Sequence, residues 1–246
     1  MPPGAGRKSV YMLELEGIKP SSQILDELAK EGKPVILNFS RGKDSVALWA
    51  ELHKRQMQVI PVHYSMVPDL QFVKSDLQRY EQHYQTHIYD LPADTFYDML
   101  QHNLNQPPER AALCESFRLS APDKDEYDAV FRANYAEPNT WMLDGVRATD
   151  SSMRRMAIMR HGPVKPKTRR ISGIWDFHVA DVREAVKQGG IELGIDYQWW
   201  NHSFEGLWYQ YLEPIRRNAP EDYERILFWF PILETEILRG GGGHLG

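Results

Sequence analysis

Cysteine is nearly absent from this sequence of 246 residues, and so are long apolar runs. The single cysteine, Cys114, cannot form an internal disulfide, so nothing indicates an oxidising compartment. No apolar run approaches the ~18–20 residues that a membrane-spanning helix needs, and no apolar stretch long enough for a signal peptide follows the first eight residues. These absences predict a cytoplasmic protein without membrane contact.

A global excess of positive charge is also missing, because the formal net charge is -5. Contact with nucleic acid would therefore have to be local. One basic run, residues 160–170, fits such a local contact with nucleic acid. It fits equally a loop that closes over an anionic ligand, or a loop exposed to solvent. None of the nine histidines has a second ligand at metal spacing, so no metal site is predicted.

Strands alternate with helices through the first two thirds of the chain. Apolar runs in residues 35–39, 58–64, 86–89 and 141–144 predict strands, and residues 21–29, 45–55, 72–84 and 95–104 have helical periodicity. Pro61 is unusual in the second strand because proline removes a hydrogen-bond donor. The alternation predicts an α/β fold with a mostly parallel, doubly wound sheet between two layers of helices.

The pattern changes after about residue 190. Residues 204–217, 221–229 and 232–239 all have helical character, and four tryptophans crowd into this part of the chain. We therefore predict an α/β domain over residues 1–190 and a helical extension over 191–246 that ends in a flexible glycine-rich tail. The tryptophans indicate either a packed helical core or a surface for a protein partner.

A serine-containing loop follows the first predicted strand. It reads Ser40-Arg41-Gly42-Lys43-Asp44-Ser45 and leads directly into a helix. A helix N-terminus offers unpaired N–H donors and a partial positive charge, to which the loop adds hydroxyl groups and a lysine. The spacing is not that of a Walker P-loop. The loop predicts a phosphate-binding site, with Asp44 as a helix cap or a ligand for a metal carried on the phosphates.

This loop resembles the PP-loop, usually S-G-G-K-D-S, of the adenine nucleotide alpha-hydrolase-like superfamily. The chain departs from that pattern at Arg41, which stands where glycine is usual and offers a phosphate contact of its own. The resemblance implies an adenine nucleotide as ligand, held by Ser40, Arg41, Gly42, Lys43, Asp44 and Ser45.

A second motif follows the fourth predicted strand. In residues 144–155 a glycine turn at Gly145 precedes Arg147, Ser151 and Arg154, and both arginines are placed to converge on an anion at the carboxyl edge of the sheet. A solvated basic loop would have the same arginine spacing. The pattern G-x-R-x-x-[DE]-S-x-x-R is similar to the second motif of the phosphoadenosine phosphosulfate (PAPS) reductase family. Residues 174–182, with Trp175, resemble the stretch that follows it in that family.

Two features depart from a reductase. The family carries its reactive cysteine in a C-terminal E-C-G-[IL]-H segment, whereas this chain ends Gly243-His244-Leu245-Gly246 without one. Cys114 is the one candidate nucleophile, and a small buried core residue is the alternative interpretation. After the second strand, where the family has an Asp-Thr-Gly-like segment, Asp69 is the nearest carboxylate.

Three functions remain open from the sequence. The first is ATP-dependent adenylylation of an acceptor, with Lys43, Asp44, Arg147 and Arg154 in the catalytic site and magnesium on the phosphates. The second is reduction of PAPS or adenosine phosphosulfate (APS) through Cys114. The third is a nucleotide-binding module of a larger assembly, docked through its C-terminal helices or as a homo-oligomer.

Overall fold

The computed structural model describes residues 12–116 and 123–239, which form two compact units. The first unit comprises the chain up to Phe39, Lys43–Ile60 and Asn139–Glu192, and the second comprises Ser40–Gly42, Pro61–Pro138 and the chain from Leu193. Residues 193–239 thus belong to the same unit as residues 61–138, and the extension that the sequence predicts begins two residues earlier, at 191. The predicted glycine-rich tail lies outside the described residues.

Six strands form one sheet in the order β3-β2-β1-β4-β6-β5. They are β1 (Val35–Asn38), β2 (Val59–Ser65), β3 (Tyr89–Pro92), β4 (Met142–Asp144), β5 (Val164–Lys165) and β6 (Arg170–Ser172). The pairs β2–β3, β1–β4 and β4–β6 are parallel, and β5–β6 is antiparallel. β2 forms as predicted because its ladder with β3 begins at Val62, beyond Pro61.

Helices follow the strands in the pattern that the sequence predicts. The two units contain α1 (Ser21–Glu31), α2 (Lys43–Lys54), α3 (Gln71–Tyr84), α4 (Asp94–Gln101), α5 (Pro108–Ser116), α6 (Lys124–Tyr135), α7 (Ser152–His161), α8 (Val179–Gly189), α9 (Asp196–Trp200), α10 (Tyr209–Asn218), α11 (Pro220–Trp229) and α12 (Glu234–Leu238). Because β2 and β6 lie on opposite sides of the β1–β4 pair, right-handed crossovers place α2 and α7 on opposite faces of the sheet. The predicted α/β class and the mostly parallel, doubly wound sheet are confirmed.

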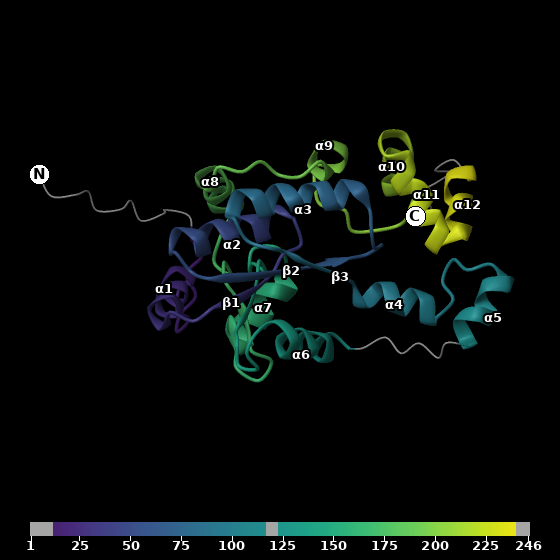
Figure 1. Ribbon diagram of the computed structural model, residues 1–246. Helices are drawn as coiled ribbons and strands as arrows, with labels where there is room; N and C mark the ends of the chain where they lie inside the picture. Colours follow the sequence, from purple (N-terminus) through teal and green to yellow (C-terminus); the bar gives the residue numbers. More distant parts are fainter. Residues whose placement is uncertain (1–11, 117–122, 240–246) are drawn as a thin grey trace, which may run out of the picture. The chain divides into compact units, whose positions relative to one another are not determined.

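The core of the first unit lies between α2 and the central strands. α2 and α8 lie side by side over β1 (Figure 1), and Leu48 of α2 is fully buried. Packing is so close that a methyl group added at Gly173 would lie 2.6 Å from Cδ1 of Leu48. The rings of Phe39 and Trp49 meet edge to face with centroids 4.9 Å apart. This packing holds the N-terminus of α2 at the carboxyl end of β1.

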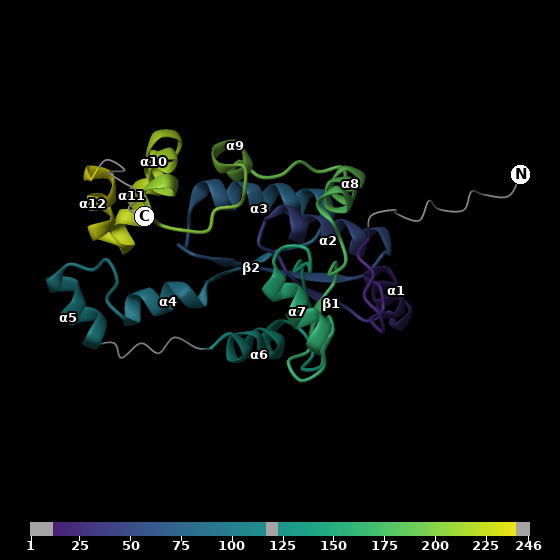
Figure 2. The same ribbon diagram turned by 180° about the vertical axis from the view of Figure 1, so that it is seen from behind.

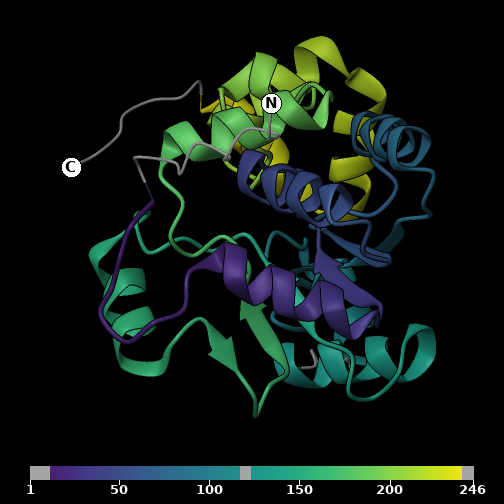
Figure 3. The same cartoon turned by 90° about the vertical axis from the view of Figure 1, so that its left-hand side faces the viewer.

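The basic run of residues 160–170 forms ordered structure. It ends α7 and continues into a hairpin of β5 and β6, drawn as two neighbouring green arrows in Figure 3. Arg169 lies with its guanidinium carbon 3.9 Å from the ring centroid of Trp141 and donates to the carbonyl oxygen of Asn139. The run therefore lies at an edge of the sheet, and its contact with nucleic acid stays a prediction.

Aromatic side chains form the core of the second unit around α3. Phe72 contacts Trp199 and Phe204 with ring centroids 5.3 and 5.7 Å apart, and Trp200 packs on Tyr211 at 5.2 Å. α10, α11 and α12 gather into one group (Figure 2). Trp199 and Trp200 thus serve as packing residues, one of the two interpretations that the sequence leaves open.

The predicted helix over residues 204–217 is wrong in its first part. α10 begins only at Tyr209, and the residues between α9 and α10 are not helical. Phe204 lies in this non-helical loop, where its amide donates to Oδ2 of Asp196, eight residues earlier, at 2.8 Å. Short-range periodicity does not reveal this partner. In residues 12–116 and 123–239, no helix is long and apolar enough to cross a membrane.

The start of α1 also depends on a distant residue. The two serines at the start of this helix predict an N-cap from a serine side chain. The N-cap position is instead Pro20, which offers no capping side chain. Asp176, far along the chain, accepts from the amide of Ser21 at 3.0 Å and contacts the Ser21 hydroxyl. The Asp176 side chain is fully buried, and this burial raises its pKa to about 6. A buried carboxylate thus replaces the expected local cap.

We predict that Asp176→Asn flattens the pH dependence of stability between about pH 4 and 6. The folded-state pKa lies above the unfolded value, so the folded state binds the proton more tightly, and this group's contribution is lost as pH rises through that window. The free energy of unfolding of the variant, relative to that of wild type, should rise by roughly 2–3 kcal/mol between pH 4 and 7. Urea unfolding across this range measures it.

The matched control is Asp26→Asn, at an exposed carboxylate that pairs with Arg55 on the protein surface. Its stability difference from wild type should stay nearly constant with pH. Parallel curves for wild type and Asp176→Asn would contradict the prediction.

Candidate functional site

The predicted phosphate loop lies between the carboxyl end of β1 and the first turn of α2. Arg41 adopts φ 61°, in the left-handed region, and α2 begins at Lys43. The first amides of α2 therefore belong to the loop itself, as an anion site requires. The side chains of Lys43 and Asp44 are 38% and 25% exposed, so both are within reach of a ligand. The strand–loop–helix arrangement is the one that the sequence predicts.

The second motif lies directly against this loop within the first unit. A methyl group added at Gly145 would lie 2.8 Å from the carbonyl carbon of Asp44 and 3.0 Å from the amide nitrogen of Ser45. Such distances leave no room for any side chain larger than hydrogen at position 145. Gly145 thus lets the turn after β4 approach the backbone of the phosphate loop, and the two motifs form one continuous site.

Arg147 links the two motifs through carboxylates. Its Nε lies 2.8 Å from Oδ1 of Asp44, and its Nη2 lies 2.5 Å from Oδ1 of Asp150. Its Nη1 donates to the hydroxyl of Thr149 at 3.3 Å. The side chain is only 4% exposed. In this structure the charge of Arg147 is therefore matched by protein carboxylates, and the residue holds Asp44 in place beside the loop.

Arg154 converges with Arg147 as predicted, but the anion between them is the carboxylate of Asp150. Nη1 of Arg154 lies 2.6 Å from Oδ2 of Asp150, and its side chain remains 51% exposed. Ser151 accepts from the amide of Arg154 at 3.2 Å and so caps α7. The half-exposed Arg154 is the more accessible of the two arginines, and the hydroxyl of Ser151 serves the helix end.

Residues 174–182, which we call the third motif, make hydrogen bonds to the second motif and to the segment just before α1. The carbonyl oxygen of Trp175 accepts from the amide of Ala148 at 2.7 Å, and its indole donates to the carbonyl oxygen of Lys19 at 3.1 Å. The hydroxyl of Thr149 donates to the carbonyl oxygen of Phe177 at 2.8 Å. Trp175 is 1% exposed. These contacts indicate a structural role for this motif, which fixes the turn that carries Arg147.

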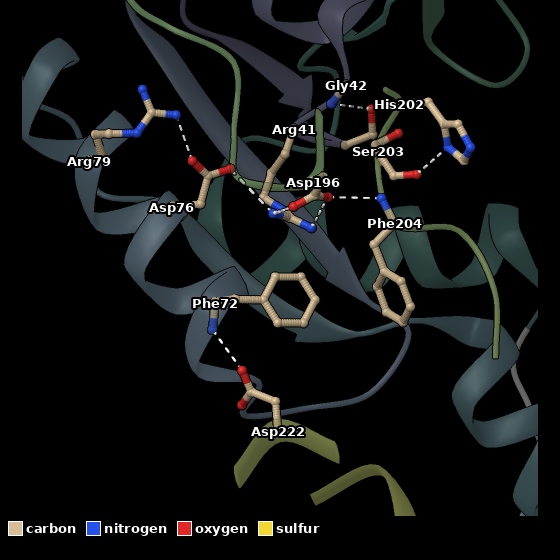
Figure 4. Close-up of polar contacts among 11 residues, drawn as sticks. Arg41, Gly42, Phe72, Asp76, Arg79, Asp196, His202, Ser203, Phe204 and Asp222 are labelled. Carbon is tan, nitrogen blue, oxygen red and sulfur yellow. Dashed lines mark hydrogen bonds and ion pairs between the residues drawn. The ribbon is translucent and has the colours of Figure 1, made fainter. Parts of the chain in front are cut away.

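The first half of the phosphate loop belongs to the second unit, where Arg41 is buried between two carboxylates (Figure 4). Its Nη1 and Nη2 donate to the two oxygens of Asp196 at 3.0 and 2.9 Å, and Nη1 also reaches Oδ2 of Asp76 at 3.2 Å. Arg79 neutralises the other oxygen of Asp76 at 2.6 Å. The Arg41 side chain is only 2% exposed, and its charge is paired within the protein. The phosphate contact predicted for Arg41 is therefore not available to its side chain and remains possible only for its backbone amide.

Sequence reasoning missed Asp76 and Asp196 as parts of the site. They lie in helices, 35 and 155 residues from Arg41, and no motif includes either of them. The arginine at position 41, in place of the usual glycine, is the one feature of the sequence that indicates a partner for this loop. Gly194 leaves space for the carboxylate of Asp76, because a methyl group at position 194 would lie only 2.3 Å from Oδ2 of Asp76. Their shared role appears only in three dimensions.

Two further predicted residues lie in different surroundings. Asp69 is half exposed and pairs with Lys74 at 2.5 Å, and this hydrogen bond lowers the pKa of its carboxyl. Cys114 is a free, partly buried thiol on α5, which packs against α4. Arg110 of the same helix lies over the ring of Phe228. Neither residue belongs to the group of contacts around the phosphate loop.

Gly145 allows the turn after β4 to lie directly against the backbone of Asp44 and Ser45, and the side chain of Lys43 is 38% exposed. Within the described ranges, which omit residues 1–11, 117–122 and 240–246, no cluster of three or more His, Cys, Asp or Glu residues is arranged to hold a metal.

The likeness of this chain to known proteins lies in its structure. No protein-family model matches the chain, and no curated protein matches its sequence. Among solved structures, the chain is similar to an NH3-dependent NAD synthetase from Campylobacter jejuni subsp. jejuni NCTC 11168 in complex with the nitrate ion. The TM-score is 0.44 at 12% sequence identity, over 90% of this chain and 91% of that one.

We predict that Arg41→Ala destabilises the protein by about 3–5 kcal/mol. The substitution leaves two buried carboxylates, Asp76 and Asp196, without their shared cation. Lys74→Ala is the control, since it breaks a pair of half-exposed residues and should cost no more than about 1 kcal/mol. Urea denaturation measures both, and equal losses for the two variants would contradict a structural role for Arg41.

Proposed function

We propose that this chain is a PAPS-reductase-like member of the PP-loop superfamily that uses ATP to adenylylate an acceptor. The observation that carries the proposal is the close fit of Gly145 against Asp44 and Ser45, which joins the phosphate loop and the second motif into one site. A plain βα turn has no need of such an approach. The motifs that support the proposal thus lie together in space as well as in order.

The reaction we propose is substitution at the α-phosphorus. An acceptor oxygen forms a bond to this phosphorus, the bond from it to the bridging oxygen breaks, and pyrophosphate leaves with that oxygen and its electron pair. A hydroxyl acceptor also releases its proton to solvent, whereas a carboxylate has none to release. Magnesium on the phosphates would supply further neutralisation of the charge on the leaving group.

Each loop residue has a role in this proposal. The backbone amides at the start of α2 bind phosphate oxygens, and Ser40 and Ser45 add hydroxyl donors. Lys43 stabilises the charge that develops on pyrophosphate. Arg147 positions Asp44, and the more exposed Arg154 binds the second anion or the acceptor. The exposure of Lys43 and Arg154 and the contact of Arg147 with Asp44 support these roles.

Cys114 does not enter the proposed reaction. Reduction of PAPS or APS would need a thiolate at the nucleotide. The thiol of Cys114 lies on α5, whose described contacts are with α4 and with Phe228 of the second unit. Activation of an acceptor needs no thiol. The acceptor itself, a protein partner on the C-terminal helices, a homo-oligomer and a nucleic-acid contact at residues 160–170 stay predictions.

The proposal is tested by incubating the protein with ATP, magnesium and a panel of acceptors while pyrophosphate release is measured. We expect release with at least one acceptor. We further expect Lys43→Ala to reduce kcat/KM roughly 100-fold or more, because a charge that stabilises the transition state is lost.

Lys54→Ala is the matched control, because Lys54 lies in the last turn of the same helix and is 63% exposed. Its kcat/KM should remain near wild type. Nucleotide binding by the wild-type protein without pyrophosphate release for any acceptor would refute adenylylation.

A further inference from the structure

The segment between α9 and α10 passes directly beside the first half of the phosphate loop. A methyl group added at Gly42 would lie 3.3 Å from Oγ of Ser203 and 3.3 Å from Oγ of Ser40. Both hydroxyls therefore lie beside the space that glycine leaves open at position 42. Figure 4 shows Ser203 next to Gly42. Ser40 is part of the predicted loop, whereas Ser203 lies more than 150 residues later and belongs to no motif in the sequence.

Asp196 holds this segment in place. One of its oxygens, Oδ2, accepts from Nη2 of Arg41 at 2.9 Å and from the amide of Phe204 at 2.8 Å. The same carboxylate thus contacts the phosphate loop and the residue next to Ser203. Since Asp196 is 1% exposed, water does not compete for these contacts.

Aromatic packing adds a second restraint. Phe204 packs between Phe72 and Trp200, with ring centroids 5.7 and 5.8 Å apart. Nδ1 of His202 lies 2.9 Å from the carbonyl oxygen of Ser203. The residues on both sides of Ser203 are therefore held by contacts of their own. A side chain positioned in this way presents its hydroxyl without a large cost in conformational entropy.

We propose that Ser203 is a further phosphate-binding residue, which donates its hydroxyl to a nucleotide phosphate bound at the first half of the loop. In this structure the amide of Gly42 donates to Oγ of Ser40 at 3.4 Å. Arg41 and Asp196 are positioning residues that bring the Ser203 segment to the loop. Arg41 stands where the PP-loop usually has glycine, and its pairing with Asp196 holds the Ser203 segment beside the first half of the loop. This inference rests on the proposed function, because it takes an adenine nucleotide as the ligand.

The test is calorimetric titration of ATP into wild type, Ser203→Ala and Ser75→Ala. Ser203→Ala removes one oxygen, and the loss of a hydrogen bond to a charged group should weaken ATP binding roughly tenfold. Ser75→Ala makes the same change on the exposed face of α3 and should bind ATP as wild type does. A melting temperature for each variant confirms that the fold is kept.

A double-mutant cycle with Asp196→Asn tests the positioning role. If Asp196 acts through Ser203, Asp196→Asn weakens ATP binding in the wild-type background and has little further effect on Ser203→Ala. Purely additive losses would overturn the positioning role, because a general structural effect is independent of the hydroxyl.

The outcomes also separate this inference from the function on which it rests. ATP binding that is unchanged within twofold in Ser203→Ala overturns the inference and leaves the proposed function standing. Wild-type protein that does not bind ATP overturns both. A tenfold loss confined to Ser203→Ala, with Ser75→Ala unaffected, supports the inference.

Discussion

The buried ion pairs of Arg41 are the interaction on which the first half of the phosphate loop depends. A non-glycine residue in the left-handed region carries a cost of about 1–2 kcal/mol, and a buried guanidinium needs full pairing. Two oxygens of Asp196 and one of Asp76 accept from Nη1 and Nη2 of Arg41 within 3.2 Å. Because these carboxylates come from α9 and α3, the arginine fixes the loop and both helices in a single arrangement.

The same physical logic governs the second half of the site. Arg147, at 4% exposure, pairs with Asp44 and Asp150, whereas Lys43 and Arg154 remain 38% and 51% exposed. All three cations pair with protein carboxylates, because Nζ of Lys43 lies 3.0 Å from Oδ2 of Asp44 and Nη1 of Arg154 lies 2.6 Å from Oδ2 of Asp150. Arg147 is buried in its pairing, whereas Lys43 and Arg154 are also accessible to solvent.

Motifs that look functional in a sequence can be structural in the fold. Trp175 and Asp176 belong to the third motif, residues 174–182. Trp175 is almost wholly buried, and Asp176 caps α1. Their contacts with Ala148 and Ser21 connect the turn of the second motif to the start of the chain's first helix. Asp222 acts similarly, accepting from the amides at the start of α3 at 2.5 and 3.0 Å.

The sequence by itself determined the α/β alternation, the loop between β1 and α2 and the glycine turn after β4, because each depends on residues that are neighbours along the chain. It placed most helices and strands within a few residues and overextended the helix before Tyr209. Only the tertiary structure decided that Arg41 is a structural cation, that Asp176 caps α1 and that Ser203 lies beside Gly42. These roles join residues 35 to more than 150 positions apart. No local pattern encodes such a pairing, since it arises when distant segments bury their charges against one another.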